Sequence, residues 1–217
     1  MSQYFVIYKP FGIHSQFSGE DSLKELGEFP PDVYPVGRLD KDSEGLLLIT
    51  DDKALNHHLL DPKFGHSRTY LVQVEGVPTE EALRQLEEGV DINIKGQIYR
   101  TKHAKAKLLA DLPDLPERNP PIRIRLNVSD SWIALELIEG KNRQVRRMTA
   151  AVGFPTLRLI RWAMEGLNIN KYQVGEIREL EQEELYSVLK IDRNALANPS
   201  GNRAAKSFRS YRNKNKR

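Results

Sequence analysis

The apolar residues of this chain fall into short runs, and this pattern limits the possible folds more than any other feature. None of the runs approaches the length of about 18 residues that spans a bilayer. Two runs are compact, and the others resemble alternating strands with one buried face. The predicted strands are Tyr4–Tyr8, Leu46–Thr50, Arg68–Glu75, Ile122–Leu126, Trp132–Ile138 and Leu157–Ala163.

Helices are expected between and after these strands. Asp51 or Asp52 can cap one helix, and Thr79 followed by two glutamates opens another, since acidic residues stabilise a first turn. The predicted helices are Lys53–Leu60, Glu80–Glu88, Asn142–Val152 and Glu181–Lys190. Strands come in clusters with helices interposed, so we predict an α+β fold with a mixed, largely antiparallel sheet.

Charge and composition separate a folded body from a tail. Residues 194–217 contain seven Lys and Arg and no acid, so the net charge of +3 leaves −4 on residues 1–193. The tail has too few aliphatic residues to offset the entropy of ordering. We therefore predict one folded domain, 1–193, and a disordered basic tail, 194–217. Basic tails bind polyanions, although such a tail can also serve only solubility.

The chain lacks cysteine and lacks the features of a signal peptide. Disulfides and thiolate chemistry are therefore excluded, and the composition fits a reducing cytoplasm. The histidines have no ligand-like spacing, and without cysteine a zinc site is not expected. The segment Asp111–Pro121 holds four of the twelve prolines and predicts a surface loop.

The first segment with chemical potential is Gly37–Thr50, in which a glycine, a cation and several acids precede an apolar strand. A loop at the edge of a rigid sheet can hold a polar residue such as Asp40 in place and still expose it to a ligand. A plain turn, in which Arg38 and the acids satisfy one another, is the structural alternative. A calcium loop is not favoured, because no helix precedes the segment and its twelfth position is Asp51 rather than Glu.

The second segment is Glu139–Met148. On a helix, Val145, Met148, Ala151 and Val152 form an apolar stripe, and three arginines project away from it. Such a face is often merely solvated. Residues 141–152 contain no Asp or Glu, however, so the arginines need partners from elsewhere, either carboxylates across the fold or phosphates. The three arginines are Arg143, Arg146 and Arg147.

Together these segments resemble the pseudouridine synthases of the RsuA family. The resemblance rests on Gly37–Asp40 with Ser43–Leu47, on Arg68–Tyr70 and on Glu139–Met148, in that order. Asn119–Arg123 and Val152–Arg161 are similar to the branch of large-subunit rRNA pseudouridine synthase E. The likeness spans roughly residues 4–180, and the agreement of three separated motifs is far more specific than any one of them.

The resemblance implies a fold and a partner. The family has two subdomains around a continuous mixed sheet, binds RNA in the cleft between them, and uses no cofactor or metal. Many relatives begin with an S4 RNA-binding domain, which is not expected here because the strand Tyr4–Tyr8 starts at once. The implied substrate is ribosomal RNA, and the branch points to 23S rRNA. We expect a monomer with no obligate protein partner and no membrane contact.

The resemblance also implies roles for individual residues. Asp40 matches the essential aspartate, which acts at the glycosidic bond, either on C1′ or by taking a proton from the sugar. Tyr70 matches the tyrosine that stacks on the target base, and Arg146 the basic residue that pairs with the aspartate. Lys141 and Arg68 stand where relatives have arginine and lysine, which preserves charge but not geometry. The expected substrate-binding residues are Arg38, Arg68, Lys141, Arg143, Val145 and Arg147.

The implied chemistry agrees with these residue types. A uridine must leave its stack before its glycosidic bond is reached, and an aromatic face compensates for about 1–3 kcal/mol of stacking per base. A guanidinium keeps a nearby carboxylate ionised in a water-poor cleft. Two other functions remain open: a non-catalytic RNA-binding or ribosome-assembly protein, and a glycoside hydrolase that uses Asp40 and Glu44 as paired carboxylates.

Overall fold

The computed structural model describes residues 2–122 and 129–192. Its main feature is a nine-stranded sheet with the order β11-β1-β3-β9-β4-β8-β7, to which β2 adds at β3 and β10 at β9. β5 and β6 form a separate hairpin. The strands are β1 (Tyr4–Lys9), β2 (Tyr34–Pro35), β3 (Glu44–Thr50), β4 (Arg68–Glu75), β5 (Asp91–Ile94), β6 (Gln97–Arg100), β7 (Lys105–Leu108), β8 (Asp130–Leu137), β9 (Thr156–Met164), β10 (Leu167–Asn168) and β11 (Ile177–Glu179).

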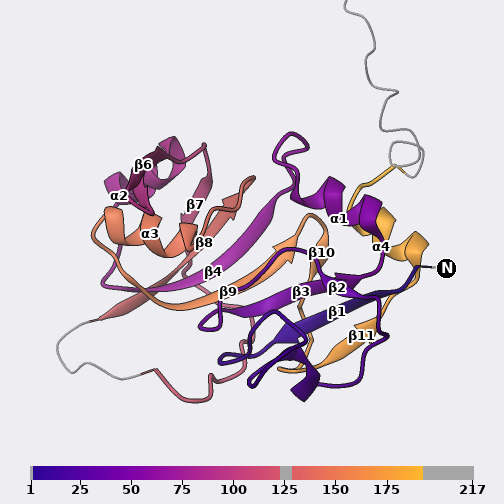
Figure 1. The fold of residues 1–217 in the computed structure, drawn as a ribbon. Coiled ribbons are helices and arrows are strands. Elements are labelled where there is room, and N and C mark those ends of the chain that lie inside the picture. Colours follow the sequence, from indigo (N-terminus) through magenta and orange to yellow (C-terminus); the bar gives the residue numbers. More distant parts are fainter. Residues whose placement is uncertain (1, 123–128, 193–217) are drawn as a thin grey trace, which may run out of the picture.

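The pairing of the strands confirms the predicted α+β class with a mixed, largely antiparallel sheet. Every strand pair in the described residues is antiparallel except β3 with β9. That parallel contact is short, with Glu44 opposite Ile160 and Gly45 opposite Arg161. It joins the strands β11, β1 and β3 to the strands β9, β4, β8 and β7, so the sheet has two halves that meet at a seam (Figure 1).

The helices form where the sequence predicted them. They are α1 (Lys53–Leu60), α2 (Glu80–Glu88), α3 (Gln144–Ala151) and α4 (Gln182–Val188), with a 3-10 turn at Leu23–Glu25. Asp52 caps α1 by accepting from the Leu55 amide at 2.9 Å, and Thr79 caps α2 through the Ala82 amide at 3.2 Å. None of the helices in the described part of the chain is long and apolar enough to cross a membrane.

Several details of the helix and strand predictions were wrong. α3 begins two residues later than predicted, because Arg143 adopts a left-handed conformation, φ 51°, at its N-cap. Ala151 is exposed and does not join the buried stripe of Val145 and Met148. The short strands β2, β5, β6, β7, β10 and β11 were not predicted, since so few residues show no clear alternation.

Several other expectations concern loops and the tail. Asp111–Pro121 has no regular secondary structure, as the prolines indicated. The predicted strand Ile122–Leu126 lies almost wholly outside the described residues, and so does the predicted tail, 194–217. Residues 2–122 and 129–192 contain no S4-type domain, and β1 begins at Tyr4.

Two groups of helices cover the two halves of the sheet (Figure 1). Leu86 of α2 and Met148 of α3 pack into a core with β4 and β8. Leu55 of α1 and Leu185 of α4 pack into the other large core, with β1 and β3. The sheet is therefore continuous, while the helices over it stand as two separate groups.

The seam between the halves is held by a close backbone contact and a buried ion pair. A Cβ on Gly45 would lie 2.3 Å from the Arg161 carbonyl oxygen, and Gly45 has φ +106°, so only glycine fits. Beside it, Glu44 accepts from Nε and Nη2 of Arg158 at 2.9 and 2.8 Å. Both side chains are more than nine-tenths buried. Arg158 also donates to the Pro116 carbonyl at 2.9 Å, which ties the proline-rich loop to the seam.

We expect Arg158→Met to lower the free energy of unfolding by about 3–5 kcal/mol, because it leaves the Glu44 carboxylate buried without the guanidinium that is hydrogen-bonded to it. The measurement is urea denaturation of the purified variants. The matched control is the double variant Glu44→Met/Arg158→Met, which should recover most of the loss because neither charge of the pair remains. A loss below about 1 kcal/mol in the single variant would mean that the pair behaves like an exposed one.

Candidate active site

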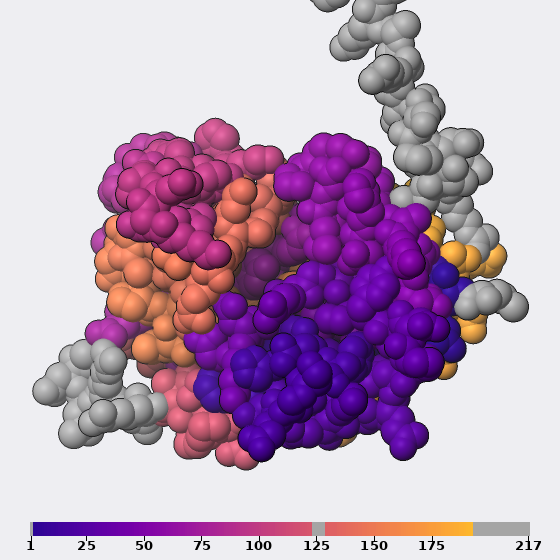
Figure 2. All heavy atoms as spheres, in the orientation of Figure 1, coloured from indigo at the N-terminus to yellow at the C-terminus, as the bar shows by residue number. Residues whose placement is uncertain are grey.

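A pocket of about 590 Å³ opens between the two helix groups, and the space-filling view shows the hollow there (Figure 2). Its wall includes the loop before β3, the end of α1, β4, the segment from β8 to α3, and β9. Its volume is typical of small-molecule sites. Seven of the nine predicted site residues line it: Arg38, Asp40, Arg68, Tyr70, Lys141, Arg143 and Val145. Arg146 and Arg147 do not.

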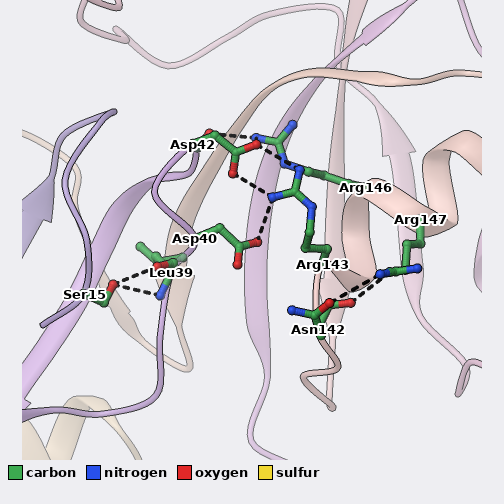
Figure 3. A network of polar contacts seen from close by, with 8 residues as sticks. All are labelled: Ser15, Leu39, Asp40, Asp42, Asn142, Arg143, Arg146 and Arg147. Carbon is green, nitrogen blue, oxygen red and sulfur yellow. Dashed lines mark hydrogen bonds and ion pairs between the residues drawn. The ribbon is translucent and has the colours of Figure 1, made fainter. Parts of the chain in front are cut away.

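Asp40 stands on a loop that an upstream segment holds from behind. Ser15 is buried; its hydroxyl donates to the Leu39 carbonyl at 2.9 Å and accepts from the Leu39 amide at 3.0 Å (Figure 3). On the other side of Asp40, the Gly12 amide donates to the Lys41 carbonyl at 2.8 Å. The backbone on both sides of Asp40 is therefore fixed, and its side chain remains 36% exposed.

The upstream segment itself depends on a buried amine. The Lys9 ammonium donates to the carbonyls of Pro10 and Ile13 at 2.8 and 2.6 Å. Burial lowers the pKa of Lys9 to about 8, and the neighbouring Glu44 opposes that shift. This lysine was not predicted as functional. It orders the segment behind Asp40, and the charge of Asp40 also acts on it directly.

The arginines of the second motif meet the acids of the first, as Figure 3 shows. Arg143 makes two hydrogen bonds to the Asp42 carboxylate, at 3.0 and 2.9 Å, and its Nη1 lies 3.6 Å from Oδ2 of Asp40. Arg146 donates to the Asp42 carbonyl at 2.7 Å and lies 3.4 Å from its carboxylate. Carboxylates across the fold were one of the two kinds of partner expected for these arginines.

The expected pairing of Arg146 with Asp40 is not what the structure shows. Among the described residues, the ion pair to Asp40 comes from Arg143. The left-handed backbone at Arg143 explains the difference, because it turns this side chain out of the helix and toward the Asp40 loop. Arg146 lies one turn further along, where its guanidinium reaches Asp42 instead.

Asp42 concentrates negative charge at the positive end of α3. Burial would raise the pKa of Asp42, but the hydrogen bond from Arg143 and the charge of Arg146 outweigh it and hold that pKa below its ordinary value. Burial also lowers the pKa of Arg146, with Asp42 opposing the shift. The helix dipole and two cations thus anchor the loop that holds Asp40.

The inner wall of the pocket comes from β4 and β9. Tyr70 is half-buried and lies opposite Arg161. Arg68 lines the pocket, but its guanidinium donates to the carbonyls of Leu59 and His66, at 2.8 and 3.4 Å. Arg68 therefore orders the chain between α1 and β4. Arg161, a buried residue of the motif that was given no role, is part of this wall as well.

A group of pocket residues that links the β5–β6 hairpin to the second motif was not predicted, because its contacts join segments that are far apart in the sequence. The Tyr99 hydroxyl donates to Glu139 at 2.6 Å, and this hydrogen bond raises the pKa of Tyr99 to about 12. Glu139 also accepts from Gln144 at 2.7 Å, while the Lys141 ammonium lies 4.7 Å from the centre of the Tyr99 ring. Arg147 donates to the carbonyls of Asn93 and Asn142, which fastens α3 to the hairpin rather than to the pocket.

The geometry separates Asp40 from Glu44. Glu44 is 2% exposed, is engaged by Arg158 and does not line the pocket, so it cannot serve with Asp40 as the second acid of a glycoside hydrolase. In residues 2–122 and 129–192, no three His, Cys, Asp or Glu residues are grouped as they would be around a metal ion. The pocket thus offers Asp40 as an open carboxylate accompanied by Arg143, and Tyr70 lines the same pocket.

We expect Ser15→Ala to lower the free energy of unfolding by about 1–3 kcal/mol, because it leaves both backbone groups of Leu39 without a partner. Hydrogen exchange at the Leu39 amide should accelerate. Ser131→Ala is the matched control: its hydroxyl donates to the Gly76 carbonyl at 2.7 Å, outside the pocket, so exchange at Leu39 should not change. Unchanged exchange at Leu39 in Ser15→Ala would contradict this account of the loop.

Comparison with known proteins agrees with the site. The family model of RNA pseudouridylate synthase matches residues 3–151. The chain is 52% identical over 163 residues to the ribosomal large subunit pseudouridine synthase E of Xanthomonas axonopodis pv. citri, covering 73% of this chain and 84% of that protein. It is 44% identical over 178 residues to the synthase E of Vibrio parahaemolyticus, covering 81% and 73%.

Solved structures give the same result. A crystal structure of a pseudouridylate synthase superimposes with a TM-score of 0.69 at 30% identity, covering 87% of this chain and 74% of that one. The predicted resemblance to the RsuA family and its synthase E branch is confirmed, and the family match includes Asp40, Tyr70 and the arginines of α3. This chain therefore belongs to the RNA pseudouridylate synthase family.

Proposed function

We propose that this chain converts one uridine of ribosomal RNA, in the 23S molecule, into pseudouridine. The relatives that are 44–52% identical bear the name of large-subunit pseudouridine synthases, which supports this substrate. The observation that carries the proposal is Asp40, an open carboxylate held rigidly at the wall of the pocket and accompanied by Arg143 at 3.6 Å. With ribosomal RNA as substrate, the reaction takes place in the cytoplasm, and the enzyme acts as a monomer.

The proposed reaction begins when the uridine leaves its stack and enters the pocket. Its base stacks on Tyr70, which restores part of the lost stacking energy. Asp40 then attacks C1′ or removes a proton from the sugar, and the N1–C1′ bond breaks with its electron pair on the uracil. The uracil turns and its C5 bonds to C1′, while the Asp40–C1′ bond breaks or Asp40 returns its proton to the sugar. C5 then loses a proton and N1 gains one. Substrate and product have the same atoms, so no cofactor is consumed.

The cations of the pocket have two tasks in this proposal. Arg143, which already faces Asp40, keeps that carboxylate charged when RNA excludes water. Arg38 and Lys141 are exposed on the wall of the pocket and are available for phosphates of the RNA. Arg146 supports the same loop through Asp42, and Val145 supplies an apolar contact beside the base.

We expect Asp40→Asn to abolish pseudouridine formation while RNA affinity and stability stay close to the wild type. The amide keeps the size of the side chain but can neither attack the sugar nor accept its proton. The measurement is chemical labelling of pseudouridine and primer extension on unmodified 23S rRNA fragments, with filter binding for affinity. Product from Asp40→Asn at the wild-type rate would refute the assignment.

Asp42→Asn is the matched control, since it changes the same group two residues away. It weakens the anchor for Arg143 and Arg146, so activity should fall but remain measurable. If the wild type binds the fragments yet yields no pseudouridine in any of them, the non-catalytic RNA-binding function replaces this proposal.

We also propose that residues 1–193 are the catalytic domain and that the basic tail, 194–217, strengthens RNA binding. Its seven positive charges would displace counterions from phosphates. Deletion of Gly201–Arg217 should therefore weaken RNA binding at low salt, with a change in salt slope of up to about 0.7 per phosphate engaged. A Gly/Ser tail of equal length is the control for chain length. Equal affinity with and without the deletion at low salt would contradict this role.

A further inference from the structure

Arg161 is a buried cation without a counter-charge in the described part of the chain. It is 3% exposed, and its Nε donates to the Leu46 carbonyl at 2.6 Å. Its Nη2 is buried and has no hydrogen-bond partner among the described residues. Arg158, three positions earlier on the same strand, is also buried, but its Nε and Nη2 both donate to Glu44. A guanidinium that is buried without such a counter-charge lowers the stability of the fold. We therefore expect Arg161 to have another partner.

The fold directs Arg161 into the active site through a β-bulge. The register between β4 and β9 shifts between Thr69 and Tyr70, so that Thr69 pairs with Ala163 and Tyr70 with Arg161. Without this shift Trp162 would stand opposite Tyr70, because one residue of slip moves every side chain to the other face. Opposed residues of an antiparallel pair share a face. Arg161 therefore lies beside Tyr70, and both line the pocket.

The surroundings of Arg161 favour an anion as its partner. Burial lowers the pKa of Arg161. The charge of Tyr70 and a hydrogen bond with its hydroxyl oppose this shift of the pKa, and the cation Arg68 adds to it. Lys9 also interacts with it. Two other buried atoms of pocket residues, Oγ of Ser43 and Nε2 of His66, have no hydrogen-bond partner in residues 2–122 and 129–192, and burial lowers the pKa of His66. Of the two arginines at the inner wall, Arg68 is held by backbone carbonyls, whereas Arg161 has a nitrogen, Nη2, without a partner among the described residues.

We infer that Arg161 is a further catalytic residue, which binds the uracil while it is detached from the sugar and bears the electron pair of the broken bond. The inference rests on the proposed function. When the N1–C1′ bond breaks, the negative charge on N1 spreads onto the carbonyl oxygens of the base. The free Nη2–H of Arg161 donates to one of those oxygens, and the charge of Arg161 is then balanced. When C5 has joined C1′ and N1 has gained a proton, the base is neutral and the interaction weakens.

This arrangement divides the work between two arginines. Arg143 lies at the sugar side, beside Asp40, and Arg161 lies at the base side, beside Tyr70. A donor fixed before the reaction stabilises charge that develops in the transition state more than it stabilises the neutral substrate. The loss of Arg161 should therefore appear in kcat and not in RNA affinity.

The first test compares Arg161→Met and Arg161→Lys in single-turnover and steady-state assays on the 23S rRNA fragments. Loss of one such donor lowers kcat by about 10²–10³-fold, and we expect this for Arg161→Met with KM changed by less than about threefold, since phosphate contacts dominate affinity. Arg161→Lys keeps the charge on a different geometry and should be intermediate. Arg178→Met, an exposed arginine on β11 outside the pocket, controls for arginine loss and should match the wild type.

The second test needs neither turnover nor RNA. Uracil is neutral at neutral pH, whereas 5-nitrouracil is an anion, so the ratio of their affinities for the full chain reports a cation at the base site. We expect the wild type to favour 5-nitrouracil by tenfold or more in NMR titrations, and Arg161→Met to lose this preference. Thermal unfolding of each variant shows that it is folded under the assay conditions.

The outcomes separate the inference from the function on which it rests. An inactive wild type would refute the proposed function and this role with it. An active wild type with kcat unchanged in Arg161→Met would overturn the role of Arg161 alone. Equal binding of the two bases by the wild type, or binding of neither, would overturn it as well, even if Arg161→Met fails to fold.

Discussion

The close approach of β3 and β9 is the constraint on which the rest of the structure depends. At Gly45 the two backbones come so near that no Cβ fits, and beside it Glu44 and Arg158 neutralise each other in the interior. This seam joins the two halves of the sheet. The loop before β3 holds Asp40, and β9 holds Arg161, so a contact that secures the fold also sets the distance between the two sides of the pocket.

The pocket follows from this junction together with the charges around it. Asp40 and Asp42 come from one half of the sheet, and Arg143 and Arg146 from a helix over the other half (Figure 3). Each set of charges would be unfavourable alone. The arginines lie at the positive end of the α3 dipole, and the two aspartates of the loop repel each other. Their attraction draws the two halves together over the pocket, and the Asp40 carboxylate remains open to a ligand.

The sequence predicted much of the candidate site because each motif is a short run of neighbouring residues and can be identified without knowing the fold. Asp40, Tyr70 and Arg143 were identified from short segments and all line one pocket. The ion pair of Asp40 with Arg143 was not predicted, however, since the left-handed conformation of Arg143 cannot be read from helical periodicity. Arg68 was expected to bind substrate, but its guanidinium is held by backbone carbonyls.

What the sequence determined by itself was the set of long strands and capped helices, the α+β class and the chemical character of the two motifs, because periodicity, caps and charge are properties of neighbouring residues. Only the tertiary structure decided what depends on distant pairs. Examples are the hold of Ser15 on the Asp40 loop, 24 residues away, the ion pair between Glu44 and Arg158, 114 residues apart, and the register shift that turns Arg161 into the pocket. A single sequence contains no record of register or of which buried charges meet, since both are set by packing across the sheet.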